Sequence, residues 1–268
     1  MTRSVLVTGA STGIGEACAL RLARGGWRVY AGVRRAGDAP EGTEELLLDV
    51  TDEEQVRAAS AGIGELHGLV NNAGIALAAP LEFIPVQELR RQLDVNLVGT
   101  VAVTQAFLPQ LRASRGRIVF VGSIAGRSAL PFLGAYAASK HALEAIADSL
   151  RLEVEPFGIG VSIVQPGTIR TPIWTKSAAV ADELRAAMPA EVADLYGERM
   201  AAFRRFAAKR GEGGASVDGV ARAVEEALES ERPRTRKLVG RDARLRAGVE
   251  RLPDRLRDRI YRRVLLGE

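Results

Sequence analysis

The chain has 268 residues, of which 47% are hydrophobic and 26% are charged, and its net charge is +4. This apolar fraction is sufficient for a buried core and excludes a chain that is disordered throughout. The single cysteine excludes an intrachain disulfide, and the sequence shows neither a signal peptide nor an apolar run of about 18 residues that could cross a membrane. We therefore expect a cytoplasmic globular protein without a transmembrane segment.

Apolar segments alternate with helical patterns over the first 170 residues. Segments such as VLVTG and RIVFVG are apolar on both faces, as in strands covered by helices on both sides. The pattern predicts one α/β domain over residues 1–268, a Rossmann-type doubly wound parallel sheet with helices on both faces. The expected strands are Ser4–Thr8, Trp27–Val33, Glu45–Asp49, Leu69–Asn71, Arg117–Gly122, Gly160–Gln165 and Lys237–Val239. The expected helices are Ile14–Arg24, Asp52–Ala61, Val86–Ala113, Ala135–Glu155 and Val217–Ser230.

Residues 168–214 interrupt this alternation with helical, Ala-rich pieces and no clear strand. We expect them to form a helical substrate lid over the ends of the strands, where α/β folds bind ligands. Apolar side chains between Ile173 and Phe206 could line a pocket for an apolar substrate. Alternatively, they only pack the lid onto the body of the protein.

The C-terminal extension, residues 241–268, is expected to form two amphipathic helices broken around Pro253. From Arg232 to Glu268 there are 13 Lys and Arg residues against 5 Asp and Glu residues, so this end is strongly basic. Leu256, Ile260 and Val264 form an apolar stripe that recurs every four residues. The stripe would dock on the body or on a second subunit, or, less plausibly, lie on a membrane surface. No nucleic-acid-binding module is present, and we expect no nucleic-acid partner.

A glycine-rich segment, TGASTGIG at 8–15, follows the first strand and opens a helix. Gly9 permits the turn, Gly13 lets the backbone approach a pyrophosphate, and Gly15 permits close contact between helix and sheet. The free N–H groups at the start of the helix favour a phosphate. The residues expected to bind a dinucleotide here are Gly9, Ser11, Thr12, Gly13, Ile14 and Gly15. Alternatively, the glycines serve only the geometry of the turn.

The end of the second strand indicates which dinucleotide is bound. NAD sites usually have an acidic residue about 20 residues after the glycines, whereas this chain has Val33 followed by Arg34. A guanidinium there would pair with a 2′-phosphate, which predicts NADP(H) in preference to NAD(H). Asp49 and Val50 would contact the adenine. Alternatively, Arg34 is a solvated loop residue and Asp49 caps the next helix.

Tyr136 and Lys140 are four residues apart, and so lie on one face of a helix. Ser123 follows the strand RIVFVG, and Asn96 lies inside the long preceding helix. With these residues, six segments occur in a particular order: TGASTGIG at 8–15, DV at 49–50, NNAG at 71–74, Asn96, Ser123 with YAASK at 136–140, and PGTIRT at 166–171. Over residues 1–240 the chain therefore resembles the short-chain dehydrogenase/reductase family, in its compact single-domain branch.

The resemblance implies a role for each catalytic candidate. Tyr136 would be the general acid or base, although a free tyrosine titrates near pH 10, too high for efficient catalysis at neutral pH. Lys140 would favour the tyrosinate and hold the nicotinamide ribose, and Ser123 would position the substrate oxygen. Asn96 would hold a water that relays protons from Lys140 to solvent. Alternatively, Asn96 marks a helix kink where its side chain satisfies backbone groups.

The resemblance also implies the remaining coenzyme contacts. Asn71, Ala73 and Gly74 would flank the adenosine ribose, while Asn72 would tie neighbouring strands together. The residues expected to frame the nicotinamide are Pro166, Gly167, Ile169 and Thr171. The two histidines have no partners at ligand spacing, and we expect no metal site.

The sequence thus predicts an NADP(H)-dependent oxidoreductase acting on a ketone or secondary alcohol. We expect an apolar substrate, resembling a steroid, retinoid, fatty or polyketide compound. The family resemblance implies a homodimer or homotetramer that pairs through the long helices 86–113 and 135–155. The alternative is a non-catalytic NADP(H)-binding protein of the same fold that senses redox state.

Overall fold

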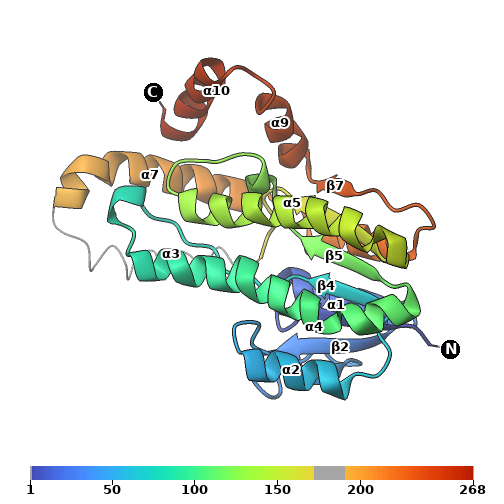
Figure 1. Ribbon diagram of the computed structural model, residues 1–268. Helices are drawn as coiled ribbons and strands as arrows, with labels where there is room; N and C mark the ends of the chain where they lie inside the picture. Colours follow the sequence, from blue (N-terminus) through green and yellow to red (C-terminus); the bar gives the residue numbers. More distant parts are fainter. Residues whose placement is uncertain (1, 172–190, 268) are drawn as a thin grey trace.

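Parallel strands form the centre of the structure, a computed structural model that describes residues 2–171 and 191–267 (Figure 1). The strands are β1 (Ser4–Thr8), β2 (Arg28–Val33), β3 (Glu44–Leu47), β4 (Gly68–Asn71), β5 (Arg117–Val121), β6 (Gly160–Pro166) and β7 (Arg236–Val239). They form one seven-stranded sheet in the order β3-β2-β1-β4-β5-β6-β7, and every neighbouring pair is parallel. The predicted doubly wound Rossmann-type sheet is confirmed.

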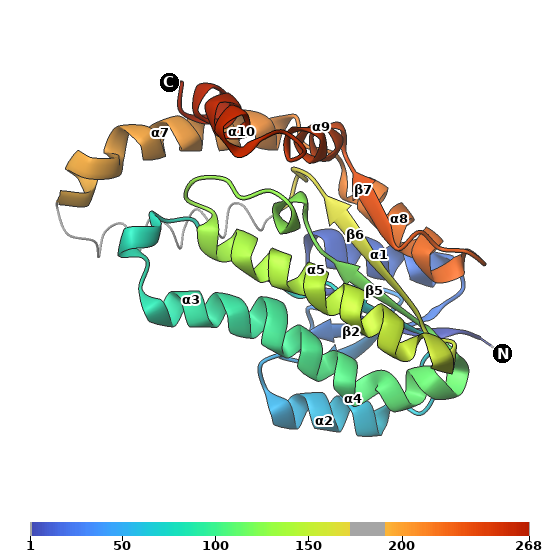
Figure 2. The same ribbon diagram turned by 45° about the horizontal axis from the view of Figure 1, so that its top comes forward.

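Helices cover both faces of this sheet (Figure 2). They are α1 (Gly13–Arg24) and α8 (Val217–Glu229) on one face, and α2 (Glu53–Gly62), α4 (Gly99–Ser114) and α5 (Gly134–Val154) on the other. Successive residues of a strand point to opposite faces, and β1 shows the consequence. Val5 and Val7 pack with the α1 and α8 side chains, whereas Leu6 packs with those of α2, α4 and α5. Both faces are buried, which explains why the strands are continuously apolar.

The predicted long helix from Val86 to Ala113 is interrupted. It consists of α3 (Val86–Leu93), a π-helical turn at Asp94–Val98, and α4. A π turn inserts an extra residue into the helix and changes the direction of the side chains around it. Asn96 lies in this turn, so the irregular backbone coincides with a predicted functional residue.

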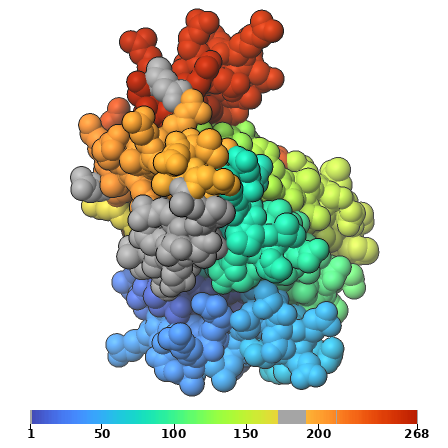
Figure 3. All heavy atoms as spheres, turned by 90° about the vertical axis from the view of Figure 1, so that its left-hand side faces the viewer, coloured from blue at the N-terminus to red at the C-terminus, as the bar shows by residue number. Residues whose placement is uncertain are grey.

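The C-terminal extension contains the two predicted helices, α9 (Arg241–Val249) and α10 (Asp254–Tyr261), and α10 continues into a π-helical turn at Arg262–Leu266. It stands next to α7 (Glu191–Glu212), the described helix of the lid, at one end of the molecule (Figure 3). Lid residues 172–190 lie outside the described residues. In the described ranges, none of the helices is both long and apolar enough to cross a membrane.

The extension docks on the body through a different face from the predicted one. Of the apolar stripe, Leu256 is 44% exposed and Val264 is 52% exposed. The neighbouring face is buried instead, because Leu265 packs with Leu130, Leu133 and Phe203. Helical periodicity identified an apolar face but could not show which face would be buried. The Tyr261 hydroxyl is hydrogen-bonded to Ser128 at 3.1 Å and donates to Glu250, and these polar contacts turn the adjacent face toward the body.

Two adjacent substitutions test this docking. We expect Leu265→Ala to lower the free energy of unfolding by about 2–5 kcal/mol, because it leaves a cavity under the extension. Val264→Ala should change it by no more than about 0.5 kcal/mol, because that side chain is half exposed. Equilibrium urea unfolding measures both values, and equal losses for the two variants would contradict the docked orientation.

Candidate active site

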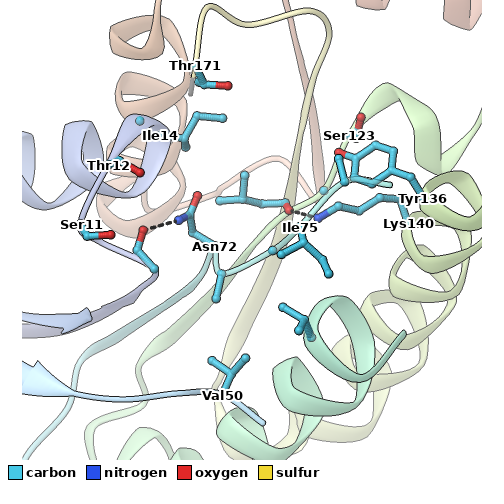
Figure 4. A pocket seen from close by; sticks show the side chains of 18 of the residues that line it. Ser11, Thr12, Ile14, Val50, Asn72, Ile75, Ser123, Tyr136, Lys140 and Thr171 are labelled. Carbon is cyan, nitrogen blue, oxygen red and sulfur yellow. Dashed lines mark hydrogen bonds between the residues drawn. The ribbon is translucent and has the colours of Figure 1, made fainter. Parts of the chain in front are cut away.

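A cleft of about 610 Å³ opens at the carboxyl ends of the strands. β1 and β4 are neighbours in the sheet, and the chain leaves them in opposite directions, toward β2 and toward β5. Such a switch point leaves a crevice between the connections, which is where open α/β sheets bind ligands. Residues that follow β1, β2, β4, β5 and β6 all line this cleft (Figure 4).

The glycine-rich turn forms one end of the cleft. Gly9 and Gly13 have φ angles of +65° and +66°, which glycine adopts without strain. Helix α1 begins at Gly13 beside the cleft, and Thr12 at its N-cap makes no side-chain capping hydrogen bond to the first N–H groups of the helix. The predicted residues of the turn that line the cleft are Gly9, Ser11, Thr12, Gly13 and Ile14. Gly15 lies behind them, where a Cβ would be 2.1 Å from the carbonyl oxygen of Gly9.

Thr8 and Asn72 fix this turn to the end of β4. The Thr8 hydroxyl accepts hydrogen bonds from the N–H groups of Asn72 and Ala73, both at 3.0 Å. The Asn72 amide donates to the carbonyl oxygens of Thr8 at 2.9 Å and Gly9 at 3.1 Å. The predicted role of Asn72 as a tie between strands therefore matches its contacts, and Thr8 is a positioning residue that the sequence interpretation missed.

Asn71 does not line the cleft, contrary to the prediction that it flanks a ribose. Its side-chain amide donates to the Thr104 hydroxyl of α4 at 2.9 Å and is buried. Asn71 is the last residue of β4, and its side chain points toward α4, whereas Asn72 lies beyond the strand and lines the cleft. Ala73 and Gly74, which were predicted with Asn71, do line the cleft.

The far end of the cleft contains Arg34, Asp49 and Val50, as predicted. The Arg34 side chain is exposed at the end of β2. Asp49 accepts hydrogen bonds from the N–H and hydroxyl of Thr51 at 2.9 and 2.7 Å, and so shapes the turn after β3. It does not cap α2, because Asp52 accepts from the first N–H groups of that helix.

Ser123, Tyr136 and Lys140 meet at the opposite wall (Figure 4). Ser123 follows β5, while Tyr136 and Lys140 come from successive turns of α5. The Ser123 side chain lies beside the Tyr136 ring, and the Lys140 ammonium lies 5.9 Å from the centre of that ring (Figure 4). Lys140 Nζ donates to the carbonyl oxygen of Val121 at 3.0 Å, which fixes the lysine against β5.

Burial dominates the electrostatics of this wall. Tyr136 is 8% exposed and Lys140 is 6% exposed. Burial raises the pKa of Tyr136, and the hydrogen bond from Ser123 and the positive charge of Arg246 oppose that rise. Burial lowers the pKa of Lys140 to about 8, against the attraction of the Glu144 carboxylate. The pKa of each group thus depends on burial and on a neighbouring charge: that of Arg246 for Tyr136, and that of Glu144 for Lys140.

Asn96 is buried beside the cleft and does not line it. Its side-chain oxygen accepts from Ile75 N–H at 2.8 Å, and its amide donates to the Ile75 carbonyl and to Ser139 Oγ, both at 3.0 Å. These contacts hold the loop after β4 against α5. They match the alternative interpretation, in which Asn96 sits in a helix irregularity and satisfies backbone groups.

The loop after β6 completes the cleft with the predicted residues Pro166, Gly167, Ile169 and Thr171. Several lining residues were not predicted: Ile75, Ala76 and Leu77 after the NNAG segment, and Arg91, Asp94 and Val95 of the interrupted helix. The latter three precede Asn96 by five, two and one residues, and that closeness was the available signal. Of the predicted apolar lid residues, Phe203 packs against Leu130 and Leu133, while Trp174, Leu184 and Met188 lie outside the described residues.

Comparison with known proteins agrees with this architecture. The sequence profile of the family described as short chain dehydrogenase matches residues 3–181. An NADPH-dependent 3-dehydrocapnine reductase from Ornithobacterium rhinotracheale is 34% identical, over 97% of this chain and 96% of its own length. Human retinol dehydrogenase 16 is 38% identical, over 90% of this chain and 81% of its own length.

Among solved structures, a short chain dehydrogenase from Burkholderia cenocepacia in complex with NADP superposes with a TM-score of 0.76. It is 28% identical, and the match covers 98% of each chain. The family profile spans about two thirds of the sequence, and the relatives above extend the similarity over most of the remainder. The chain is therefore a member of the short-chain dehydrogenase/reductase family of oxidoreductases.

Proposed function

We propose that the protein is an NADP(H)-dependent oxidoreductase that interconverts a ketone and a secondary alcohol, with Tyr136 as the general acid and base. The observation that carries this proposal is the meeting of Ser123, Tyr136 and Lys140 in the same cleft as the N-terminus of α1. One end of that cleft suits a phosphate and the other suits proton transfer to an oxygen.

The residues of the cleft fit a phosphorylated dinucleotide. The N–H groups at the start of α1 favour the pyrophosphate. Gly9 and Gly13, which both have a positive φ, carry no side chain and so leave room for it beside the backbone. Arg34 supplies a guanidinium at the end of β2, where a 2′-phosphate would lie. Lys140 and Thr171 line the opposite end, as needed to hold the nicotinamide riboside. The coenzyme named in the 3-dehydrocapnine reductase and in the Burkholderia structure is of the same kind.

A nicotinamide held by Lys140 and Thr171 would supply the hydride for reduction of the carbonyl carbon, or accept it from the alcohol carbon in oxidation. In reduction, the electron pair of the C=O π bond moves to the oxygen, which takes the hydroxyl proton of Tyr136. Ser123 holds that oxygen by a hydrogen bond. The charge of Lys140 stabilises the tyrosinate that remains, and solvent returns the proton.

An apolar substrate suits the surroundings of Tyr136. Its ring packs with Ala76 and Ala125, and Leu77 lines the cleft next to them. Beyond them, Leu130 and Leu133 form a buried cluster with Phe203 of α7. The name of the human relative refers to retinol, an apolar alcohol. We infer an apolar ketone or alcohol for this chain as well.

Removing the phenolic hydroxyl tests the role of Tyr136. We expect Tyr136→Phe to lower kcat for carbonyl reduction by about 10²–10⁴-fold, because the proton donor is lost. NADPH affinity, measured by fluorescence titration, should stay close to the wild-type value. Tyr30→Phe is the matched control, because Tyr30 lies on β2 and is not among the residues that line the cleft. Retained turnover in Tyr136→Phe would exclude Tyr136 as the donor.

A neighbouring pair of arginines tests the choice of coenzyme. We expect Arg34→Ala to raise KM for NADPH by about 10–100-fold, because a charge-assisted hydrogen bond to phosphate is lost. KM for NADH should change little. Arg35→Ala is the control, since Arg35 is also exposed and is not among the residues that line the cleft. Equal effects on both coenzymes would rule out a 2′-phosphate contact at Arg34.

The pKa of Lys140 predicts an alkaline limit to carbonyl reduction. Because the lysine is charged only below its pKa of about 8, the rate should fall as the pH rises through that value. Glu144→Gln removes the carboxylate that favours the ammonium, so its alkaline limb should move to lower pH. Asp148→Asn should leave the limb in place, although Asp148 and Glu144 both bind Arg236. Superimposable pH–rate profiles for the two variants would contradict this assignment.

A further inference from the structure

Helix α9 of the C-terminal extension contacts the loops on both sides of the catalytic wall. It packs against β7 and against the 3-10 turn Ile124–Gly126, which directly follows Ser123. In its first turn, Asp242 accepts the N–H of Thr168 at 2.6 Å. Gly167, which lines the cleft, lies so close that a Cβ there would be 2.2 Å from Asp242 Oδ1. The extension therefore fixes the loop after β6, and the same helix also contacts the loop after β5.

One turn further along α9, Arg246 forms hydrogen bonds with the loop after β5. Its Nε and Nη2 donate to the Ser128 hydroxyl at 3.1 and 2.7 Å, and Nη2 also donates to the Ser128 carbonyl at 3.1 Å. Ser128 is fully buried and follows Ser123 by five residues. Several bonds from one rigid guanidinium to one residue fix the orientation of the charged group as well as its position.

The charge of Arg246 is only partly balanced by its surroundings. The groups that face it are Tyr136 of α5, Tyr261 of α10, and Asp242 and Glu250 at the two ends of α9. Glu250, however, pairs with Arg257 at 3.5 Å and accepts the Tyr261 hydroxyl. Burial lowers the pKa of Arg246 from its usual value, yet a guanidinium stays protonated at any pH at which the protein is active.

Tyr136 consequently has two positive charges beside it, on different segments. Lys140 lies one turn away on the same helix. Arg246 is bonded to Ser128, on the loop whose Ala125 packs against Tyr136, and its charge opposes the rise in the pKa of the phenol. Ser123 is the third group that faces the phenol. A positive charge near a buried phenol favours the ionised form.

We propose that Arg246 is a positioning residue of the active site: fixed by Ser128, its guanidinium stabilises the tyrosinate form of Tyr136. The C-terminal extension is then part of the catalytic apparatus. This inference rests on the proposed role of Tyr136, because only a proton-transferring tyrosine gains from that stabilisation.

Tyrosine titration tests the inference without requiring a substrate. The chain has four tyrosines, and Arg246 also lowers the pKa of Tyr261, so each variant is titrated by ultraviolet absorbance with and without Tyr136→Phe, and the difference isolates the ionisation of Tyr136. We expect Arg246→Met to raise the pKa of Tyr136 by about one pH unit. Arg246→Lys keeps the charge and should remain near the wild-type value. Arg257→Met is the control, since it removes an arginine of the same extension that pairs with Glu250 and Asp254 and is not among the groups that shift the pKa of Tyr136.

The pH profile of alcohol oxidation gives the second readout. In Arg246→Met, the rising limb of this profile should move to higher pH by about one unit. At a fixed pH below the midpoint, the oxidation rate should therefore fall about tenfold. Arg246→Lys and Arg257→Met should leave the limb in place. If Arg246→Met does not fold, Arg246→Gln carries the same expectation, because its amide can still donate to Ser128. An unchanged Tyr136 titration in the charge-removing variant, or an equal shift in Arg257→Met, would overturn the inference. A shifted titration in a protein that oxidises no alcohol would support the role of Arg246 and count against the proposed reaction alone.

Discussion

A lysine ammonium buried one helical turn from a phenol is the constraint that organises the site. Removing a charge from water is costly unless partners replace the lost hydration. Val121 of β5 supplies a carbonyl oxygen to Lys140, and Glu144 supplies a negative charge from the next turn of α5. Glu144 is itself buried, and it is held by Gln165 of β6 at 2.7 Å and by Arg236 of β7 at 2.9 Å. The charge state of one lysine therefore depends on three neighbouring strands.

This dependence explains the composition of one face of α5. Tyr136, Lys140, Glu144 and Asp148 recur at four-residue intervals and so lie on one face of the helix, and the last two both pair with Arg236. The first half of the face carries the proposed chemistry, and the second half compensates its charge. Replacing a member of the second half should alter the reactivity of the first through electrostatics, even where no atom of the substrate is near.

The features that sequence could predict are those fixed by neighbours along the chain. Continuous apolar strands, the glycine-rich turn and the spacing of Tyr136 and Lys140 depend on local backbone geometry, and the strands and helices formed close to where they were expected. The features that the sequence could not predict are directions and distant partners. Whether Asn71 or Asn72 lines the cleft depends on where β4 ends and on the contact of Asn71 with α4. The orientation of the Asn96 side chain is set by its hydrogen bonds to a loop about twenty residues away in the sequence. The stripe Leu256, Ile260 and Val264 has the right period, but the polar contact of Tyr261 with Ser128 selects the adjacent face.

The two ends of the cleft are thus held by different kinds of interaction. The proposed coenzyme end is held by bonds from the Thr8 and Asn72 side chains to backbone groups of the turn and of β4, and changes at other side chains leave these bonds intact. The substrate end is held by side chains from separate segments: the loop after β5, α7 and the extension meet through Leu130, Phe203 and Leu265. Side-chain packing responds to each substitution in its volume and shape. A substitution at Leu130, Phe203 or Leu265 should therefore reshape the proposed substrate end of the cleft without disturbing the bonds of Thr8 and Asn72 at the other end.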